Sequence, residues 1–538
     1  MSMEFNLADL FESVADAAAS EEALVSGHRR LTYDALDRRA NRLAHHLAAS
    51  GVRPGDPIGV QLTNGSEYLE TMLACFKIRA VPVNINYRYV ARELEYLYGN
   101  AGLVGLVFHS RFGPAVTASL GAMSERRALL EVADGTIPTG AADDYEEILA
   151  SSLEHRGFPV RRPDDRYCVY TGGSTGMPKG VLWRHDDIFF AAMGGGDPLS
   201  LGDQITRPEE LAGRILHPGM VALAIPPFMH AAGHWLAFST FFGGGTVVTT
   251  ADGGFDPTAV WQLVEAERVN TLVVVGDAMA RPLLEVLAAA PGRYDLSSLI
   301  AVGSGGALLS PTTKAQLAEL LPGRIVADRF GSSETGQVGG ESPTTDPFGP
   351  PRLRLDDKTA VFDERMEPIR PGSGAIGHLA RSGHVPLGYL GDPSASANTF
   401  VESGGRRWAL PGDLATVAAD GTITVLGRGS LCINTGGEKV FPDEVEAVVK
   451  DHVDVADAIV VGVADERFGE RVVAIVQARP GRVIDSESLR LHCHERLTGF
   501  KVPKDFLVVE RIERSPSGKP DYPQARTLAE AGTNRTGR

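Results

Sequence analysis

The regular alternation of helix-like and strand-like segments is the feature that most constrains the fold. Residues 31–50 carry apolar side chains at helical spacing, and the short apolar run at 57–62 that follows them is typical of a buried strand. Such alternation indicates a mostly parallel sheet whose faces are covered by helices. It continues with helical patterns at 67–79, 257–267 and 279–290 and with strand-like runs at 221–225 and 271–275.

The chain changes character beyond about residue 350. Residues 350–381 are rich in Pro, Gly and turn-forming residues, and a compact unit follows residue 427. We therefore predict an α/β fold with a large N-terminal domain and a smaller α+β C-terminal domain of about 110 residues. The last dozen residues, rich in Gly, Thr and Arg, are expected to form a frayed tail. In the smaller domain the helical patterns lie at 442–450 and 486–497, and the strand-like runs at 456–463, 472–478 and 506–509.

The charge balance and the cysteines limit the partners and the compartment. The 52 basic and 68 acidic side chains give a formal net charge of −16, which argues against a nucleic acid or an anionic membrane as main partner. The four cysteines, Cys75, Cys168, Cys432 and Cys493, form no CxxC pair, so no disulfide framework is expected. The N-terminus lacks a signal-peptide pattern, and no apolar run reaches the ~20 residues that cross a bilayer. A cytoplasmic protein is the expectation.

A glycine-rich string at residues 170–180, Tyr-Thr-Gly-Gly-Ser-Thr-Gly-Met-Pro-Lys-Gly, is the most informative motif. Four glycines, three hydroxyl side chains and one lysine within eleven residues suit a loop that wraps phosphate oxygens. The spacing is not that of a Walker A loop, because Pro178 precedes Lys179 and Gly180 follows it. The string therefore predicts phosphate binding of a different type.

This string resembles the phosphate-loop signature of the adenylate-forming superfamily, which includes acyl-CoA synthetases, peptide-synthetase adenylation domains and luciferases. The resemblance runs from residue 31 to residue 526 and rests on this string and six further motifs in the family's order. The loop residues that it implies for ATP binding are Thr171, Gly172, Gly173, Ser174, Thr175, Gly176 and Lys179.

Three further motifs imply the rest of the nucleotide site. The segment 226–233 resembles one in which a histidine, here His230, lies between substrate and nucleotide. A glycine turn that follows the apolar run 299–302 is similar to the turn that lies against adenine, here Gly305, Gly306 and Ala307. Residues 328–335 resemble the "YGxTE" segment, in which Phe330 would stack on adenine, Ser333 would contact the α-phosphate and Glu334 would bind Mg²⁺. Asp328, Arg329 and Gly331 belong to the same nucleotide-binding segment.

The remaining motifs imply ribose binding, coenzyme A binding and the catalytic lysine. Asp413 would hold the ribose hydroxyls with support from Arg428, which opens the interdomain linker. Gly436 and Gly437 would line the pantetheine tunnel, and Lys439 would contact phosphate. Lys519 would neutralise the carboxylate and the α-phosphate as they approach each other. The predicted domains are an adenylation domain at 1–427, a hinge at 428–431 and a mobile domain at 432–538. Ser430 departs from the family's usual Asp or Lys at the hinge.

The family resemblance implies two half-reactions. A carboxylic acid and Mg-ATP give acyl-AMP and pyrophosphate, and the acyl group then passes to coenzyme A. Transfer to a carrier protein and a non-catalytic nucleotide sensor stay open as alternatives, whereas the absence of an aspartate in 228–234 disfavours amino acids. Small residues in the candidate acyl pocket favour a long or bulky apolar acid, although packing explains them equally well. The strings at 84–89 (Asn-Ile-Asn-Tyr-Arg-Tyr), 183–187 and 432–439 look like those of actinobacterial ligases that act on sterol side-chain carboxylates. Both a monomer and a homodimer stay open.

Overall fold

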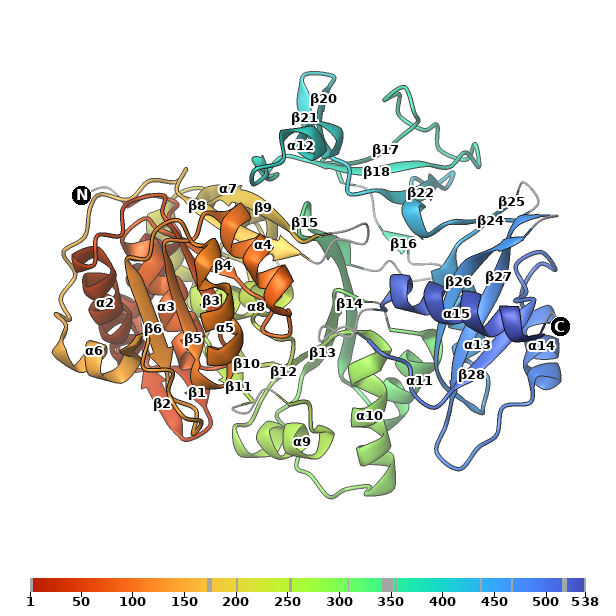
Figure 1. Cartoon of the computed structure of the whole chain (residues 1–538), viewed down its shortest axis with the longest axis horizontal. Coiled ribbons are helices and arrows are strands. Elements are labelled where there is room, and N and C mark those ends of the chain that lie inside the picture. Colours follow the sequence, from red (N-terminus) through yellow and green to blue (C-terminus); the bar gives the residue numbers. More distant parts are fainter. Residues whose placement is uncertain are drawn as a thin grey trace.

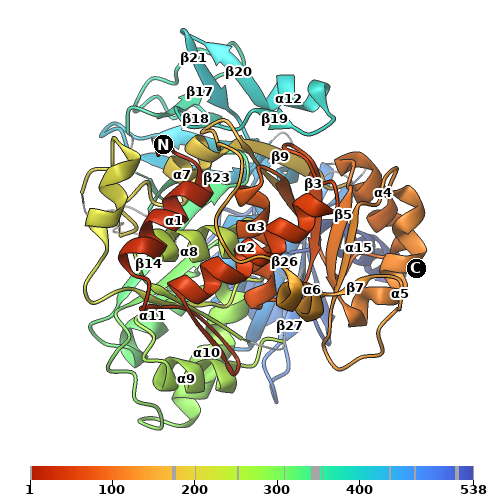
Figure 2. The same cartoon turned by 90° about the vertical axis from the view of Figure 1, so that its left-hand side faces the viewer.

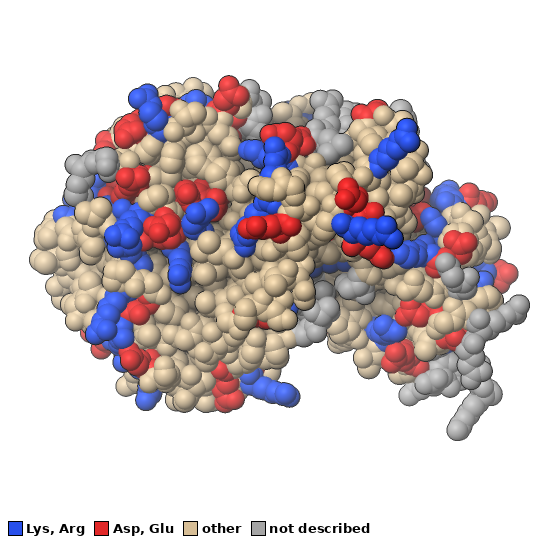
Figure 3. Space-filling view, turned by 90° about the horizontal axis from the view of Figure 1, so that it is seen from above, with Lys and Arg blue, Asp and Glu red and all other residues tan. Residues whose placement is uncertain are grey.

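The computed structural model consists of a large N-terminal part and a smaller C-terminal domain, which lies beside helices α10 and α11 in Figure 1. It describes residues 3–171, 177–199, 202–250, 254–307, 309–340, 352–353, 356–435, 438–465, 468–514 and 520–536. Lys and Arg side chains are interspersed with Asp and Glu over the face that Figure 3 presents. Within the described ranges, no helix combines the length and the apolar character that a bilayer span requires.

Two mainly parallel sheets form the body of the N-terminal part. In the first sheet the inner strands run parallel, and only the edge strands β2 and β15 are antiparallel to their neighbours. In the second sheet β9 and β19 form the antiparallel edge. The first sheet has the order β15 (Gly336–Gly340), β14 (Ile325–Ser332), β13 (Ala301–Gly305), β12 (Thr271–Val274), β10 (Val221–Ala224), β11 (Thr246–Thr249), β1 (Glu22–Ser26) and β2 (Arg29–Thr32). The second has the order β19 (Gly388–Tyr389), β9 (Lys179–Arg184), β8 (Arg166–Thr171), β4 (Val81–Asn84), β3 (Pro57–Gln61), β5 (Gly105–His109), β6 (Ala128–Val132) and β7 (Asp143–Asp144).

Helices separate and cover these two sheets (Figure 2). The middle layer contributes its apolar faces to one buried cluster shared with both sheets, as the sequence pattern of α2 requires: Leu36, Ala40, Leu43, Ala44 and Leu47 are all fully buried. Middle-layer helices are α1 (Leu7–Ala17), α2 (Tyr33–Ala49), α3 (Ser66–Lys77) and α8 (Ala231–Phe242). Outer helices are α4 (Ala91–Ala101) and α5 (Gly113–Ser119) on the second sheet, and α9 (Pro257–Ala266), α10 (Gly276–Ala289) and α11 (Pro311–Leu320) on the first. Shorter helices are α6 (Tyr145–Ser151), α7 (His185–Ala192) and α12 (Pro393–Thr399).

A third, antiparallel sheet connects this body to the C-terminal domain. It comprises β16 (Arg352–Leu353), β17 (Thr359–Phe362), β18 (Gly377–Ser382), β20 (Phe400–Ser403), β21 (Arg406–Ala409), β22 (Asp413–Val417) and β23 (Ile423–Arg428). The fourth sheet, in the C-terminal domain, comprises β24 (Ile433–Thr435), β25 (Glu438–Val440), β26 (Val455–Asp465), β27 (Gly469–Ala478) and β28 (Asp505–Val509). Helices α13 (Pro442–Lys450) and α14 (Ser486–His494) cover one of its faces, and α15 (Tyr522–Thr536) covers the other.

The C-terminal domain docks onto α10 and α11 through polar contacts. Arg281 on α10 donates from Nη1 to the carbonyl oxygen of Ala456 (2.7 Å) and from Nη2 to that of Lys450 (3.3 Å). Thr312 on α11 donates to Asp451 Oδ1 at 2.5 Å. The Arg281 side chain is only 9% exposed, so this contact lies inside the interface.

Two sequence expectations about elements are wrong. The apolar strand expected at 299–302 begins at Ala301 and continues to Gly305, because β13 pairs with β14 along its whole length and with β12 from Ala301 to Ser304. The expected frayed tail is helix α15, which continues to Thr536. The reason is tertiary packing: Ala525 and Ala529 are buried in a cluster with apolar residues of β26, β27 and β28.

Candidate active site

The carboxyl edge of the first sheet gathers several of the predicted site residues. His230 is the N-cap of α8, which follows β10, and Gly305 ends β13. Phe330 lies near the end of the adjacent β14, and Gly305 pairs in register with Arg329. Ligands of parallel α/β sheets bind outside this edge of the strands. The arrangement therefore places the histidine loop, the glycine turn and the "YGxTE" segment around one region.

Asn84 joins the second sheet to this edge. Its Nδ2 donates to the carbonyl oxygens of Tyr170 (2.9 Å) and Met229 (2.6 Å), and its Oδ1 accepts from the Tyr170 N–H (2.6 Å). The side chain is 3% exposed. Asn84 thus fixes the end of strand β8, which leads into the phosphate loop, against the residue that precedes His230. In the sequence, Asn84 is only the first residue of the string at 84–89, and nothing in that string reveals its contacts with Tyr170 and Met229.

The glycine turn leaves room beside β13. A Cβ atom at Gly305 would meet no atom within 4 Å, so open space lies next to this residue. Gly306 has φ +87°, a backbone conformation that residues with a side chain rarely adopt. Ser304 fixes the turn, because its Oγ donates to the Ala307 carbonyl at 2.6 Å and accepts from the Gly276 N–H at 2.9 Å. The geometry fits a planar group lying against the backbone.

The residues of β14 differ in exposure. Asp328 is 3% exposed and its Oδ2 lies 2.8 Å from Lys314 Nζ, whereas Arg329 is exposed. Phe330 is half-buried and packs against the cluster of the third sheet. Gly331 admits no side chain, since a Cβ there would lie 2.2 Å from the Gly336 carbonyl oxygen. This glycine is required by the close approach of β15.

Glu334 is the predicted metal ligand, and its carboxylate is held by a tyrosine. The residue is 7% exposed, and the Tyr389 hydroxyl donates to its Oε1 at 3.0 Å. Trp183 Nε1 donates to the Ser333 carbonyl oxygen at 3.0 Å and so fixes the neighbouring backbone. No group of three or more His, Cys, Asp or Glu suited to a metal occurs in the described part of the chain. A single carboxylate fits Mg²⁺, which is commonly held by one or two carboxylates together with substrate phosphates.

Lys179 lies next to the same tyrosine. Its Nζ is 5.1 Å from the centre of the Tyr389 ring and 3.6 Å from Asp392 Oδ2. Lys179 pairs in register with Thr171 at the base of the phosphate loop. The loop residues Gly172, Gly173, Ser174, Thr175 and Gly176 lie outside the described residues.

Asp413 and Arg428 face each other on β22 and β23. They pair in register, and Arg428 Nε lies 3.7 Å from Asp413 Oδ1. The C-terminal domain approaches here, since a Cβ at Gly427 would lie 2.9 Å from Asp443 Oδ2. Tyr522, the first residue of α15, donates to the other oxygen of Asp443 at 3.3 Å. The start of α15 therefore lies close to the predicted ribose site.

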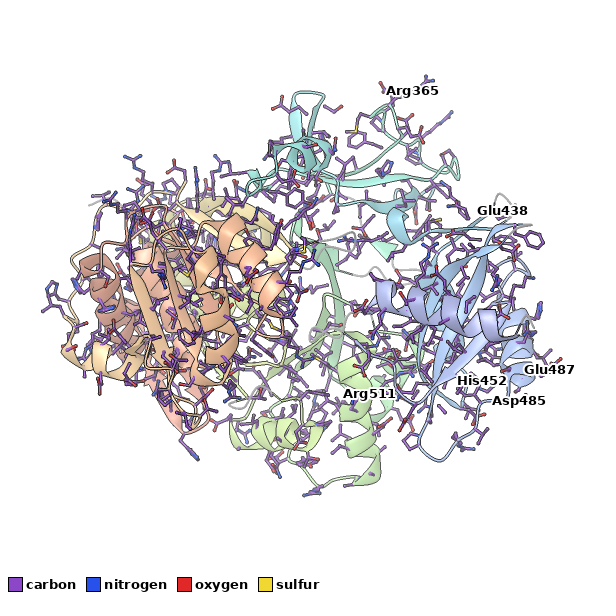
Figure 4. All side chains as sticks on the ribbon, viewed as in Figure 1. Arg365, Glu438, His452, Asp485, Glu487 and Arg511 are labelled. Atoms are coloured by element: carbon purple, nitrogen blue, oxygen red, sulfur yellow. The ribbon has the colours of Figure 1, made fainter. Side chains whose placement is uncertain are left out.

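The structure does not bring Lys439 to the other site residues. Lys439 lies exposed on β25. Its neighbour Glu438 lies at the top of the C-terminal domain, well separated from β13 and β14 (Figure 4). Gly436, Gly437 and the predicted catalytic Lys519 lie outside the described residues.

Fold and site motifs together define an enzyme that binds AMP. The chain belongs to the AMP-binding enzyme family: the model of the AMP-binding enzyme matches residues 11–390, and that of its C-terminal domain matches residues 444–519. The predicted superfamily and fold class are thereby confirmed. The anthranilate CoA ligase in complex with anthranoyl-AMP has the same fold, with a TM-score of 0.85, 20% identity and 99% of each chain covered.

More similar relatives narrow the class. The 3-oxocholest-4-en-26-oate–CoA ligase of Rhodococcus rhodochrous is 43% identical over 530 residues, which cover 97% of this chain and 95% of the relative. The medium/long-chain-fatty-acid–CoA/3-oxocholest-4-en-26-oate–CoA ligase of Mycolicibacterium smegmatis is also 43% identical. The matched region covers 98% of this chain and 97% of the relative. The predicted enzyme class is confirmed: an AMP-forming acid–CoA ligase, which uses ATP with Mg²⁺ and coenzyme A.

Two buried histidines predict acid sensitivity in the N-terminal domain. Burial lowers the pKa of His185 and of His234 to about 3. His234 Nδ1 lies 2.8 Å from the Tyr167 hydroxyl and Nε2 lies 3.2 Å from the Tyr68 hydroxyl. The unfolded chain binds these protons near pH 6.5, so the stabilisation is complete above that pH and is lost as the pH falls toward 3.

We expect the free energy of unfolding to fall by about 1.5 kcal/mol per buried histidine between about pH 6.5 and about pH 5. Urea unfolding at the two pH values measures this loss. His234→Gln should make the loss smaller, whereas His28→Gln, at an exposed position, should leave it as in the wild type. An equal loss in all three proteins would contradict the assignment.

Proposed function

We propose that the chain converts a long-chain or steroid side-chain carboxylic acid to its coenzyme A thioester. The observation that carries this proposal is the 43% identity, over nearly the whole chain, to ligases named for such acids. Relatives at this distance include a ligase with both a fatty-acid and a steroid-acid substrate in its name. We therefore propose an apolar acid with a bulky or extended body rather than a short one.

The open space at the site supports a large acyl group. A Cβ at Gly339 would meet no atom within 4 Å, as at Gly305. Gly339 pairs with Phe330 across β14 and β15, beside the segment that carries Glu334. His230 begins α8 nearby, at the carboxyl edge of the same sheet. We assign the acyl chain to the space near Gly339, with His230 between the acyl group and the nucleotide.

The polar groups suit acyl-adenylate formation. We propose that Glu334 binds Mg²⁺, that Lys179 and the phosphate loop contact the ATP phosphates, and that Asp413 binds the ribose. Mg²⁺, when bound, supplies charge neutralisation at the phosphates. The protein then contributes mainly positioning and fixed charges, which act on the carboxylate and the α-phosphate without further rearrangement.

The domain arrangement supports adenylation as the step for which this conformation is built. The start of α15, three residues after Lys519, lies beside the Asp413 strand, whereas β25, which carries Lys439, lies at the top of the C-terminal domain in Figure 1. We propose that the small domain turns about residues 428–431 for thioester formation. That rotation requires the contacts of Arg281 and Thr312 to break.

A pyrophosphate-release screen across short, long, aromatic and steroid acids tests the substrate. We expect release with long-chain or steroid acids and little with acetate. Preference for a short acid would overturn the substrate assignment, and no release with any acid would point to a nucleotide sensor.

The acceptor is tested separately by comparing free coenzyme A with a purified carrier protein. Transfer to coenzyme A is the expected result. Faster loading of the carrier protein would establish the alternative acceptor.

A further inference from the structure

Tyr389 contacts two predicted site residues that come from different parts of the chain. It lies on β19, which extends the second sheet by pairing with β9; Gly388 pairs with Leu182 and Tyr389 with Val181. Figure 2 shows β19 beside β9 and α12. From this strand the side chain reaches Glu334 with its hydroxyl and Lys179 with its ring face. No motif in the sequence analysis included this tyrosine.

The bond to Glu334 restricts how the carboxylate can turn. A hydroxyl that donates to an ionised carboxylate makes one of the stronger hydrogen bonds in proteins. With Oε1 engaged at 3.0 Å, the orientation of the whole carboxylate is set. A metal ligand gains affinity when a partner fixes it in this way.

The tyrosine is itself held firmly. Its N–H donates to Ser396 Oγ at 2.8 Å, and its ring packs 5.5 Å from that of Phe400. Because the backbone pairing and these contacts do not involve the hydroxyl, removing the hydroxyl alone leaves the strand in place. The contribution of the hydroxyl can therefore be separated from the structural role of β19.

We propose that Tyr389 is a positioning residue that orients the Glu334 carboxylate for Mg²⁺ and aligns Lys179 with it. The inference rests on the proposed roles of Glu334 and Lys179. In this proposal the hydroxyl orients the carboxylate that would bind Mg²⁺, and the ring holds Lys179. The ring can hold the lysine because the face of an aromatic ring attracts a cation. The two parts of the side chain thus have separable effects.

Binding of α,β-methylene-ATP, measured by calorimetry with and without Mg²⁺, tests the hydroxyl. We expect Mg²⁺ to lower the Kd of the analogue for the wild type. In Tyr389→Phe the factor by which Mg²⁺ lowers the Kd should be about tenfold smaller, as the loss of a hydrogen bond to a charged group implies. Tyr145→Phe is the matched control, because the Tyr145 hydroxyl donates to Glu70 at 2.8 Å in a buried network unconnected with the proposed metal carboxylate. It should keep the full Mg²⁺ effect.

A double-variant comparison identifies the route of the effect. If Tyr389 acts through Glu334, Glu334→Gln combined with Tyr389→Phe should show the same Mg²⁺ effect as Glu334→Gln alone. Additive losses would overturn the proposal, as would a wild-type Mg²⁺ effect in Tyr389→Phe or the absence of any Mg²⁺ effect in the wild-type protein. These results do not depend on the acid, so they differ from a failure of the pyrophosphate screen.

The ring is tested by Tyr389→Leu. We expect this variant to bind the analogue about threefold more weakly than Tyr389→Phe even without Mg²⁺, because the contact with Lys179 is lost. Equal affinities of the two variants without Mg²⁺ would remove Lys179 from the proposal.

Discussion

Replacing Lys519 by alanine is expected to slow acyl-adenylate formation by about a hundredfold or more while sparing thioester formation from supplied acyl-adenylate. The magnitude is that of losing one preorganised charge-stabilising group from a transition state. The residues that flank this lysine are well anchored: Arg514 pairs with Asp457 at 2.5 Å and forms an isolated bridge with Pro520. Tyr522 donates to Asp443 beside the Asp413 strand.

Pyrophosphate release reports the first half-reaction, and conversion of synthetic acyl-adenylate to thioester reports the second. Lys504→Ala is the matched control, since Lys504 is an exposed lysine of the same domain. It should leave both rates near the wild type. Equal loss of both half-reactions in Lys519→Ala would contradict a role confined to adenylation.

Replacing Lys77 by alanine is expected to lower the free energy of unfolding of the N-terminal domain by about 3–5 kcal/mol, the usual cost of removing one partner from a buried ion pair. The Lys77 side chain is completely buried, and its Nζ lies 2.6 Å from both Glu12 Oε1 and Asp37 Oδ1. Burial alone would raise the pKa of Glu12, but Arg161 and Lys77 together lower it to about 2. Without the lysine, two buried carboxylates lose a shared counter-charge.

Urea unfolding followed by circular dichroism measures this loss. Arg38→Ala is the control, because it removes an exposed ion pair between Arg38 and Asp34, which both lie on α2. This variant should lower the free energy of unfolding by no more than about 0.5 kcal/mol. Similar losses in the two variants would show that the buried network contributes little to stability.

The elements predicted most accurately from the sequence are those with strong local patterns. The helical pattern at 442–450 coincides with α13, and the pattern at 31–50 contains α2. Of the third sheet, only the alternating run at 422–426, which overlaps β23, gave a strand signal. The other short strands gave none, because their pairing joins segments far apart in the chain, as between Gly377 and Ala415. Helix α15 was missed because the Gly, Thr and Arg content of the last residues indicated a frayed tail, whereas Ala525 and Ala529 are buried against the sheet and stabilise a helix there.

The candidate site was predictable to the extent that its residues lie in contiguous motifs. His230, Phe330 and Glu334 were named from such strings, and the fold gathers their loops at one edge of a sheet. Tyr389 and Asn84 were not recognised, because each acts through contacts with segments that are distant in the chain. A single tyrosine or asparagine carries no spacing pattern that would reveal such contacts.

The Arg281 contact has a consequence for how this enzyme can change over evolution. Both acceptors that the C-terminal domain offers to Arg281, at Lys450 and Ala456, are main-chain carbonyl oxygens. Side chains at those two positions can therefore be exchanged without altering the groups that Arg281 recognises. A small domain grafted from a related ligase would inherit this docking contact, provided that the recipient retains the arginine.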